Sequence, residues 1–263
     1  MVNLSIRRKR SGVPVLSRRE IDCIGERFVA DFYPDALKEP QDLDVDSFAQ
    51  NYLGMGLDYQ YLSHCGVYLG MTVFNDTNAL PVYNPAEQKA EYISARANTI
   101  IIDNSLLDAS QEHRYRFTVG HECAHGILHG PYFRYDPRQL SWYDDSSVAM
   151  IQCRTDFGKT EKKNKKYWTE KDRMEWQANA FSSAVLMPKS MVLRVAEKIR
   201  RQYPGPEYET ECAYCLAQET SDAFNVSFES ATYRLKDLGV LSREIQLVPS
   251  VLNFIDVSKD EVS

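Results

Sequence analysis

Residues 117–129 read FTVGHECAHGILH, a stretch that places three histidines and one glutamate within nine positions. The whole chain contains only five histidines. Residues four apart in an α-helix lie on one face, so His121 and His125 can direct two imidazoles at one metal ion, with Glu122 beside them. This His-Glu-x-x-His spacing is typical of two zinc ligands and a general base. The alternative is a buried helix whose histidines make ordinary hydrogen bonds.

A catalytic zinc site needs a third protein ligand and an open coordination position. His129 extends the same helical face, but it lies about 6 Å further along the axis than His125 and cannot wrap a tetrahedral ion. A second helix must therefore supply the ligand, and Glu175 in MEWQANAF (174–181) is the best donor. Asn179 follows one turn later and is expected to accept a hydrogen bond from a zinc-bound histidine. Two weaker donors lie in the polar first turn of that helix: Glu170 and Asp172.

Composition limits the class of protein. The chain has 263 residues, of which 43% are hydrophobic, enough for a substantial core. Its net charge of −6 argues against a general nucleic-acid binder. No run of 18 apolar residues predicts a membrane span, and the basic N-terminus is followed by no apolar segment of a secretory signal. The six cysteines form no disulfide-like spacing, so we expect reduced thiols and a cytoplasmic location.

The pattern along the chain predicts an α+β fold. Helices are expected over 17–33, 42–54, 110–129, 169–188, 189–202, 208–222 and 227–239. Strands are expected between residues 57 and 103, in VYLGMTVF (67–74), ALPVYN (79–84) and RANTIIIDNSLL (96–107). Gly130 and Pro131 are expected to end the helix that carries the histidines. A long irregular loop is predicted over 131–168.

Two motifs together resemble a known family. RFTVGHECAHGILH (116–129) followed by EWQANAFSSAVLMP (175–188) is similar to the ImmA/IrrE family of zinc metallopeptidases, and the similarity spans most of residues 20–241. The resemblance implies a zincin-like core with a small mixed or antiparallel sheet, an active-site helix and a ligand helix, plus C-terminal helices. It implies that His121, His125 and Glu175 hold one zinc ion and that Glu122 is the catalytic base.

The resemblance also implies an activity and a partner. Members of this family act inside bacteria on helix-turn-helix repressors of mobile elements or stress programmes. Zinc would polarise the scissile carbonyl and a water molecule, and Glu122 would take a proton and return it to the leaving amine. We expect a regulatory, cytoplasmic endopeptidase, with a flexible N-terminus (1–16), a catalytic domain (17–190), a helical subdomain (191–242) and a tail (243–263). Two departures are Cys123–Ala124 within the motif and a longer insertion between the metal-binding helices.

Other readings remain open. The protein could be a metal-containing binding module or anti-repressor that docks a repressor or DNA without cleaving it. The pair Cys212–Cys215 is expected to be two ordinary helix cysteines, because no second pair completes a zinc site. The strand NTIIID (98–103) is either an edge that a substrate extends or a covered strand. One of three tyrosines could stabilise an oxyanion: Tyr132, Tyr135 or Tyr143.

Overall fold

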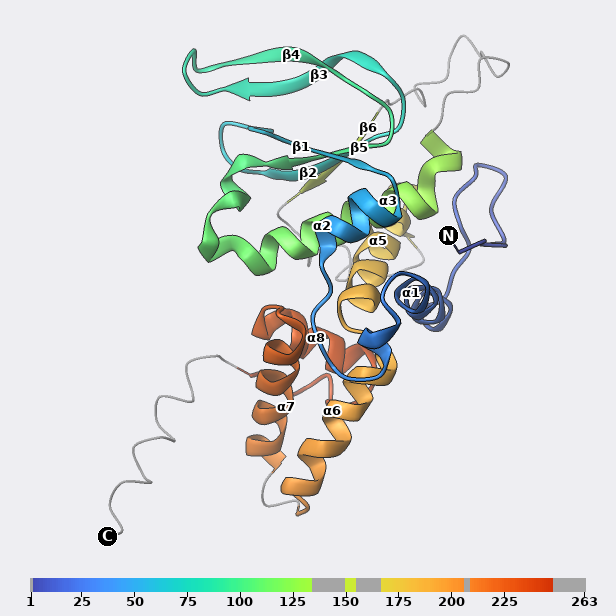
Figure 1. Cartoon of the computed structure of the whole chain (residues 1–263), viewed down its shortest axis with the longest axis vertical. Helices are drawn as coiled ribbons and strands as arrows, with labels where there is room; N and C mark the ends of the chain where they lie inside the picture. Colours follow the sequence, from blue (N-terminus) through green and yellow to red (C-terminus); the bar gives the residue numbers. More distant parts are fainter. Residues whose placement is uncertain (1, 134–149, 155–166, 206–208, 248–263) are drawn as a thin grey trace.

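The computed structural model describes residues 2–133, 150–154, 167–205 and 209–247 of the chain (Figure 1). A four-stranded sheet and a β-hairpin lie at one end of the molecule, and three C-terminal helices lie at the other. The long helix α3 (Glu112–Phe133) runs beneath the sheet, and α5 (Glu170–Leu186) and α1 (Arg18–Phe32) pack below it. The predicted α+β class is confirmed.

The four-stranded sheet is mixed, with the strand order β1-β5-β2-β6. Strand β1 (Gly56–Gln60) pairs in parallel with β5 (Thr99–Asp103), and β5 pairs antiparallel with β2 (Tyr68–Val73). Strand β6 (Met150–Arg154) completes the sheet antiparallel to β2. Of the two interpretations left open for NTIIID, the covered strand is confirmed and the edge strand is wrong, because β5 has a partner on both sides.

Alternation along β5 divides the core between two faces of the sheet. Ile100 and Ile102 join the main core with α3, whereas Ile101 joins a second cluster beneath the hairpin. The hairpin consists of β3 (Thr77–Asn84) and β4 (Lys89–Ala95). Both faces of the strand are covered, which explains its unbroken apolar run.

Helix α3 extends beyond the predicted end at His129. It continues through Pro131 to Phe133. Proline removes one backbone donor and normally ends or kinks a helix, but tertiary contacts hold this last turn. Phe133 stacks on Phe74 with ring centroids 4.8 Å apart, and Asn75 Nδ2 donates to the Phe133 carbonyl at 2.9 Å.

The predicted helices around the core are largely confirmed. Ser17 caps α1 in a capping box with Glu20, and Thr169 caps α5 in the same way with Asp172. The segment predicted as a helix over 42–54 forms the short α2 (Val45–Ser47) followed by a π-helical turn, Phe48–Tyr52. The prediction of an irregular loop over 131–168 is wrong at two places. Residues 131–133 belong to α3, and residues 150–154 form the strand β6, which pairs with β2.

Three helices follow α5: α6 (Lys189–Gln202), α7 (Glu209–Phe224) and α8 (Phe228–Asp237). Their apolar residues belong to the same core cluster as those of α1, α3 and α5. Arg234 of α8 is buried and donates to Asp22 Oδ1 of α1 at 2.6 Å and to the Met187 carbonyl at 3.1 Å. The buried face of α8 therefore serves packing, as its mixed charges indicate.

Residues 8–14 pack against the end of α3, although the first sixteen residues are predicted to be flexible. Arg8 Nη1 donates to the Leu128 carbonyl at 2.7 Å, and Val13 is fully buried. Gly12 has φ +92°, and a Cβ there would lie 3.3 Å from the Pro131 carbonyl oxygen. Because Gly12 has no side chain, the turn that it forms can lie in contact with the end of α3.

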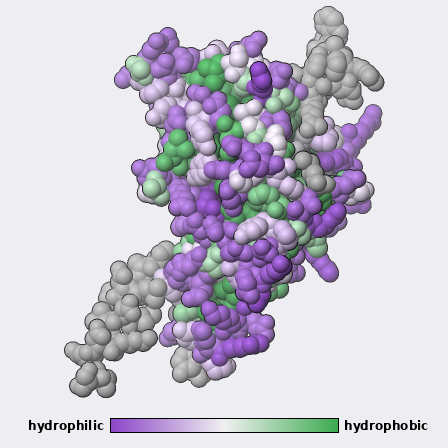
Figure 2. Space-filling view, in the orientation of Figure 1, coloured by the Kyte–Doolittle hydropathy of each residue, from purple (hydrophilic) through white to green (hydrophobic). Residues whose placement is uncertain are grey.

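The face shown in the space-filling view is mainly hydrophilic, with small hydrophobic patches between the polar side chains (Figure 2). Within the described part of the chain, no helix combines the length and hydropathy needed to cross a lipid bilayer. The five cysteines whose side chains are described are all free thiols: Cys23, Cys65, Cys123, Cys212 and Cys215.

Candidate metal centre

The centre lies where α3 and α5 approach each other closely. Gly120 faces Ser182, and a Cβ at Gly120 would lie 2.6 Å from the Ser182 hydroxyl oxygen. That hydroxyl donates to the Phe117 carbonyl at 3.0 Å and so ties the two helices together. A residue without a side chain at position 120 therefore lets α5 come near enough to present Glu175 to the histidines of α3.

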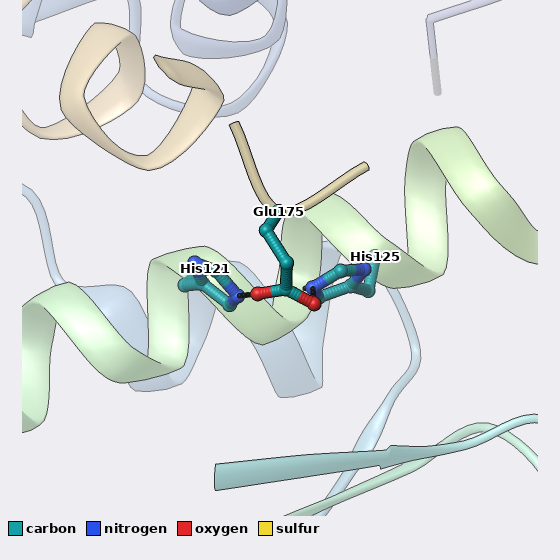
Figure 3. A group of neighbouring side chains, drawn as sticks. All are labelled: His121, His125 and Glu175. Atoms are coloured by element: carbon teal, nitrogen blue, oxygen red, sulfur yellow. Dashed lines mark hydrogen bonds and ion pairs between the residues drawn. The ribbon is translucent and has the colours of Figure 1, made fainter. Parts of the chain in front are cut away.

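His121, His125 and Glu175 form the group that can hold a metal ion (Figure 3). Each offers one ligand atom, and these atoms all lie within 4.8 Å of one another. The two Nε2 atoms are 2.9 Å apart, and the Glu175 carboxylate oxygens lie 3.4 Å from His121 Nε2 and 3.7 Å from His125 Nε2. Both imidazoles are fully buried, while the Glu175 side chain is 20% exposed. Glu175 is thus the partly exposed member of the group, although its Oε1 is buried.

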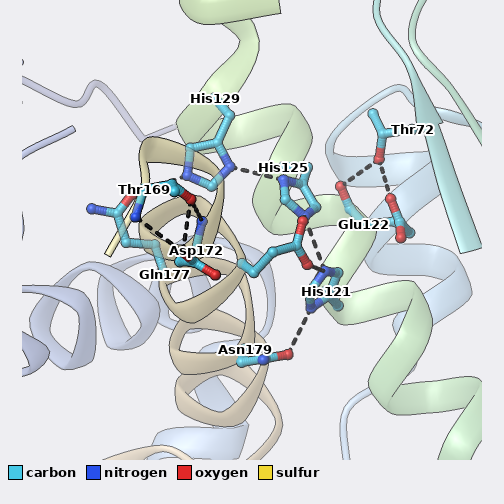
Figure 4. A network of polar contacts seen from close by, with 10 residues as sticks. Thr72, His121, Glu122, His125, His129, Thr169, Asp172, Gln177 and Asn179 are labelled. Carbon is cyan, nitrogen blue, oxygen red and sulfur yellow. Dashed lines mark hydrogen bonds and ion pairs between the residues drawn. The ribbon is translucent and has the colours of Figure 1, made fainter. Parts of the chain in front are cut away.

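The rear nitrogens of the two imidazoles have partners of their own (Figure 4). His121 Nδ1 lies 2.8 Å from Asn179 Oδ1, and His125 Nδ1 lies 2.9 Å from His129 Nδ1. The amide oxygen of Asn179 can only accept, so His121 carries its proton on Nδ1 when the ring is neutral. The Nε2 lone pair then points toward the carboxylate of Glu175.

The donor set fits a divalent cation. Two imidazole nitrogens and one carboxylate oxygen are borderline ligands of the kind that zinc accepts in catalytic sites. Burial lowers the pKa of His125 well below its ordinary value of 6.5, with repulsion from His121 and His129 acting in the same direction. A neutral imidazole is the form that binds a metal. Converging lone pairs repel each other unless a cation lies between them.

Glu122 lies beside this group, fully buried on the sheet side of α3. The Thr72 hydroxyl of β2 donates to Glu122 Oε2 at 2.6 Å, whereas Oε1 is buried without a hydrogen-bond partner. Gly70 faces the same carboxylate, and a Cβ there would lie 2.8 Å from Oε1. Strand β2 therefore holds one carboxylate oxygen and leaves the other free.

Burial raises the pKa of Glu122 from 4.5 to about 7, and Glu175 acts in the same direction. His121 and the Thr72 hydrogen bond oppose this rise without cancelling it. A carboxylate with a pKa near neutrality exchanges protons readily at physiological pH. Cys123, the next residue, is fully buried and faces the core, and burial raises the pKa of its thiol. It is a packing residue, as its place on the helix indicates.

Glu170 and Asp172, the weaker candidates for the third metal ligand, do not belong to this group. Asp172 accepts hydrogen bonds from Thr169 at the start of α5, and Glu170 accepts one from Ser11 at 2.8 Å. Tyr132 packs beside Phe133 and Val13. The other two tyrosines considered for the oxyanion, Tyr135 and Tyr143, lie outside the described residues.

Three contacts of the centre were not predicted from the sequence. Thr72 and Gly70 lie some fifty positions before Glu122, and no local pattern links a strand residue to a helix residue so far away. Gln177, whose amide oxygen lies 3.0 Å from His129 Nε2, is hidden between apolar neighbours in the sequence. The contact of His129 with His125 could have been predicted, because the two residues are one helical turn apart.

Comparison with protein-family models adds an independent observation. The model of the IrrE N-terminal-like domain, Peptidase_M78, matches residues 155–236. This segment matches the ImmA/IrrE family of metallopeptidases. The matched segment includes Glu175 and Asn179, whereas His121 and His125 precede it and reach the same point through the packing of α3 on α5. A comparison with curated proteins finds no match.

The family match and the geometry agree on the class of protein. The chain is a metallopeptidase with a candidate metal site of two histidines and one glutamate, and as a peptidase it acts on a protein substrate. The core has the zincin-like arrangement that the resemblance implies, in which one helix carries the paired histidines and a second helix carries the acidic ligand.

Proposed function

We propose that this metallopeptidase is a zinc-dependent endopeptidase that cleaves a regulatory protein, such as a helix-turn-helix repressor. The observation that carries the proposal is the convergence of His121 Nε2, His125 Nε2 and the Glu175 carboxylate beside a buried glutamate with one free oxygen. A structural site would have no use for that additional carboxylate.

Zinc is the proposed metal, held as a single ion by His121, His125 and Glu175. When bound, it supplies Lewis-acid polarisation of the scissile carbonyl and of a water molecule. Imidazole and carboxylate ligands suit this ion, and three protein ligands leave a position for solvent and substrate. Asn179 and His129 orient the two rings by contacting the nitrogens that face away from the site.

Glu122 is the proposed general base and then general acid. Its Oε1 takes a proton from the attacking water and returns it to the nitrogen of the leaving amine. The oxygen Oε2 stays hydrogen-bonded to the Thr72 hydroxyl, so the carboxylate keeps one orientation through both transfers. A pKa raised to about 7 suits both directions of transfer, because neither protonation state is strongly disfavoured near neutral pH.

The proposed substrate and location follow from the resemblance. Proteins that this chain resembles act within bacteria on repressors of mobile elements or stress programmes. The proposed location is the cytoplasm, which is supported by the free thiols of the described cysteines.

The proposed organisation is a catalytic domain over residues 17–190 and a helical subdomain over 191–242, followed by a tail over 243–263. The division falls near the start of α6. A shared apolar core supports a subdomain that packs firmly on the catalytic part. The segment 1–16 precedes the catalytic domain, and its residues 8–14 contact the end of α3.

The test is incubation of the purified protein with a candidate repressor, followed by mass spectrometry. We expect new fragments with zinc present, none after chelation, and a loss of roughly 100-fold or more in rate for Glu122→Gln. A matched control is Glu112→Gln at the exposed start of α3, which should cleave at the wild-type rate.

Two results would overturn the proposal. Cleavage by Glu122→Gln at the wild-type rate would exclude the assigned base. An intact repressor held in a stable, chelator-insensitive complex would favour an anti-repressor that binds without cleaving.

A further inference from the structure

A chain of buried hydrogen bonds leads away from His125 toward the N-terminal segment. His125 Nδ1 lies 2.9 Å from His129 Nδ1, and His129 Nε2 lies 3.0 Å from Gln177 Oε1 (Figure 4). Gln177 Nε2 then donates to the Pro14 carbonyl at 2.9 Å. Both imidazoles and the Gln177 side chain are fully buried. The chain joins α3, α5 and the residues before α1.

The chemistry of its last member fixes the direction of every bond. The Pro14 carbonyl can only accept, so the amide nitrogen of Gln177 faces it and the amide oxygen faces His129. That oxygen can only accept as well, so His129 carries a proton on Nε2. A neutral His129 then has a lone pair on Nδ1, and His125 must donate to it from Nδ1. The lone pair of His125 is left on Nε2, the atom that faces Glu175.

The direction holds only while His129 is neutral. A protonated His129 would direct a second N–H at His125 Nδ1 and reverse the hydrogen bond between the two rings. The ring is fully buried, and the described partners of its two nitrogens, His125 and the Gln177 amide, carry no negative charge that would stabilise a protonated form. This enclosure favours the neutral ring.

Pro14 itself is held in place by the packing of its segment. Arg8 and Pro14 form a β-bridge, and Lys9 N donates to the Val13 carbonyl at 2.8 Å. Arg8 Nη1 bonds both the Gly12 carbonyl, at 2.9 Å, and the Leu128 carbonyl of α3, at 2.7 Å. Val13 is fully buried against Phe133, Phe74 and Met174. The Pro14 carbonyl, at one end of this series of hydrogen bonds, thus has a fixed position.

We propose that the Pro14 carbonyl, acting through Gln177 and His129, holds His125 in the tautomer that presents an Nε2 lone pair to the metal. His129 and Gln177 are positioning residues, and residues 8–14 form part of the metal centre. The proposal rests on the proposed metal site. It also separates the roles of the two histidines, because His121 obtains the same tautomer directly from Asn179.

The first test is zinc affinity, measured by competition with a chromophoric chelator. His129→Phe removes the acceptor for His125 Nδ1, and we expect zinc to bind roughly 10- to 100-fold more weakly. His129→Gln offers an amide oxygen to the same N–H and should recover part of the loss. His113→Phe makes the same substitution at an exposed position of α3 and should bind zinc like the wild type.

The second test observes the tautomers directly in the metal-free wild type, by nitrogen-15 NMR of the imidazoles. We expect a proton on His125 Nδ1 and on His129 Nε2, and a loss of the His129 preference in Gln177→Leu. A role in folding alone would not set these protonation sites, and the wild-type spectrum does not depend on any variant folding.

Unchanged zinc affinity in His129→Phe, or a proton on His129 Nδ1 in the wild type, would overturn the proposal. A wild-type protein that binds no zinc would instead refute the proposed function, and the tautomers would still decide the positioning role separately.

Discussion

Glu122 is an acidic side chain enclosed by protein on every side, with one oxygen bonded to Thr72 and the other without a partner. The enclosure disfavours its charged form, which is the physical cause of its raised pKa. A raised pKa fits the proposed role of Glu122 as the base, because it makes the carboxylate a stronger proton acceptor. The same burial makes the ionised side chain a source of instability in the absence of the metal.

The stability of the metal-free protein should depend on pH through this group. The pKa of Glu122 is about 7 in the folded protein and close to 4.5 after unfolding. The folded state therefore binds more protons between these values, and the contribution of Glu122 to stability falls as the pH rises from about 4.5 to about 7. The full difference is on the order of 3 kcal/mol.

The measurement is the difference in free energy of unfolding between Glu122→Gln and the wild type, both stripped of metal. We expect the variant to gain relative stability with rising pH, with a plateau above pH 7. Groups that do not interact with Glu122 titrate equally in both proteins and cancel in the difference, whereas His121, which interacts with Glu122, contributes to it. A difference that stays flat from pH 4 to 8 would show that Glu122 has an ordinary pKa.

Thr72 should matter for rate more than for substrate binding. Thr72→Val keeps the shape of the side chain and removes the donor to Glu122 Oε2, a bond to a charged group worth about 1.5–3 kcal/mol. We expect kcat to fall roughly tenfold or more while KM changes little. Thr118→Val is the control, since its buried hydroxyl bonds only the Arg114 carbonyl. An equal loss of kcat in both variants would assign the effect to packing.

The sequence predicts the centre well where its spacing is local. Residues 121, 122 and 125 lie close together on one helix, and their proposed roles follow from that spacing. Glu175 could be chosen because its helix is strongly patterned and the family motif includes it. Thr72 could not be predicted, because its contact with Glu122 depends on the position of β2 over α3. Tertiary packing between distant segments leaves no periodic signal.

At the scale of elements, close helix packing depends on residues that lack side chains. Gly25 of α1 faces Ala184 of α5, and a Cβ at Gly25 would lie 2.8 Å from the Ala184 Cβ and 3.2 Å from its carbonyl carbon. Gly126 of α3 faces only the end of the Met55 side chain, and a Cβ at Gly126 would lie 2.6 Å from its terminal methyl and 2.9 Å from its sulfur. A side chain at Gly25 would thus meet the rigid backbone of α5, whereas one at Gly126 would meet a flexible methionine.

Substitution by alanine should separate these two cases. Gly25→Ala forces α1 away from α5, and we expect it to destabilise the protein by about 1–3 kcal/mol. Gly126→Ala gains helix propensity of up to about 1 kcal/mol, and the end of Met55 can move, so we expect little change or a small gain. Urea unfolding of both variants measures the difference. Equal effects at the two positions would contradict the packing of α1 on α5.

Element boundaries show which rules tertiary structure overrides. Capping residues and spacing place α1, α5, α6 and α8 nearly where they were predicted, because these signals are local. Pro131 predicts the end of a helix, yet contacts of Phe133 carry α3 past it. The strands β1 and β4 were not predicted individually, because their exposed faces carry polar residues. Whether such a segment forms a strand depends on its burial, which is known only from the assembled fold.

At the scale of the whole molecule, one ion pair links the first helix to the last. The Arg234 guanidinium is almost completely buried and bonds Asp22 of α1 and the carbonyl of Met187. Removing one partner of a buried pair leaves an uncompensated charge, which costs about 3–5 kcal/mol. We expect this loss for Arg234→Ala. Arg201→Ala removes an exposed pair with Glu197 and should change stability by less than about 1 kcal/mol.

Chemical unfolding of these two variants provides the measurement. A loss below 1 kcal/mol in Arg234→Ala would contradict the burial of that guanidinium between α1 and α8. The sequence gives no hint of this pairing, because 212 positions separate the two residues. The overall class could be predicted from element pattern and family resemblance, whereas the long-range contacts that assemble the molecule could not.

The central claim is that side chains from α3 and α5 together hold one metal ion. The most direct measurement is the zinc-to-protein ratio after dialysis against a weak chelator, for the wild type, Glu175→Gln and the matched control Glu170→Gln at the partly exposed start of α5. We expect one zinc per chain in the wild type and in the control, and far less in Glu175→Gln because the carboxylate ligand is lost. A Glu175→Gln protein that retains zinc as tightly as the wild type would contradict the account.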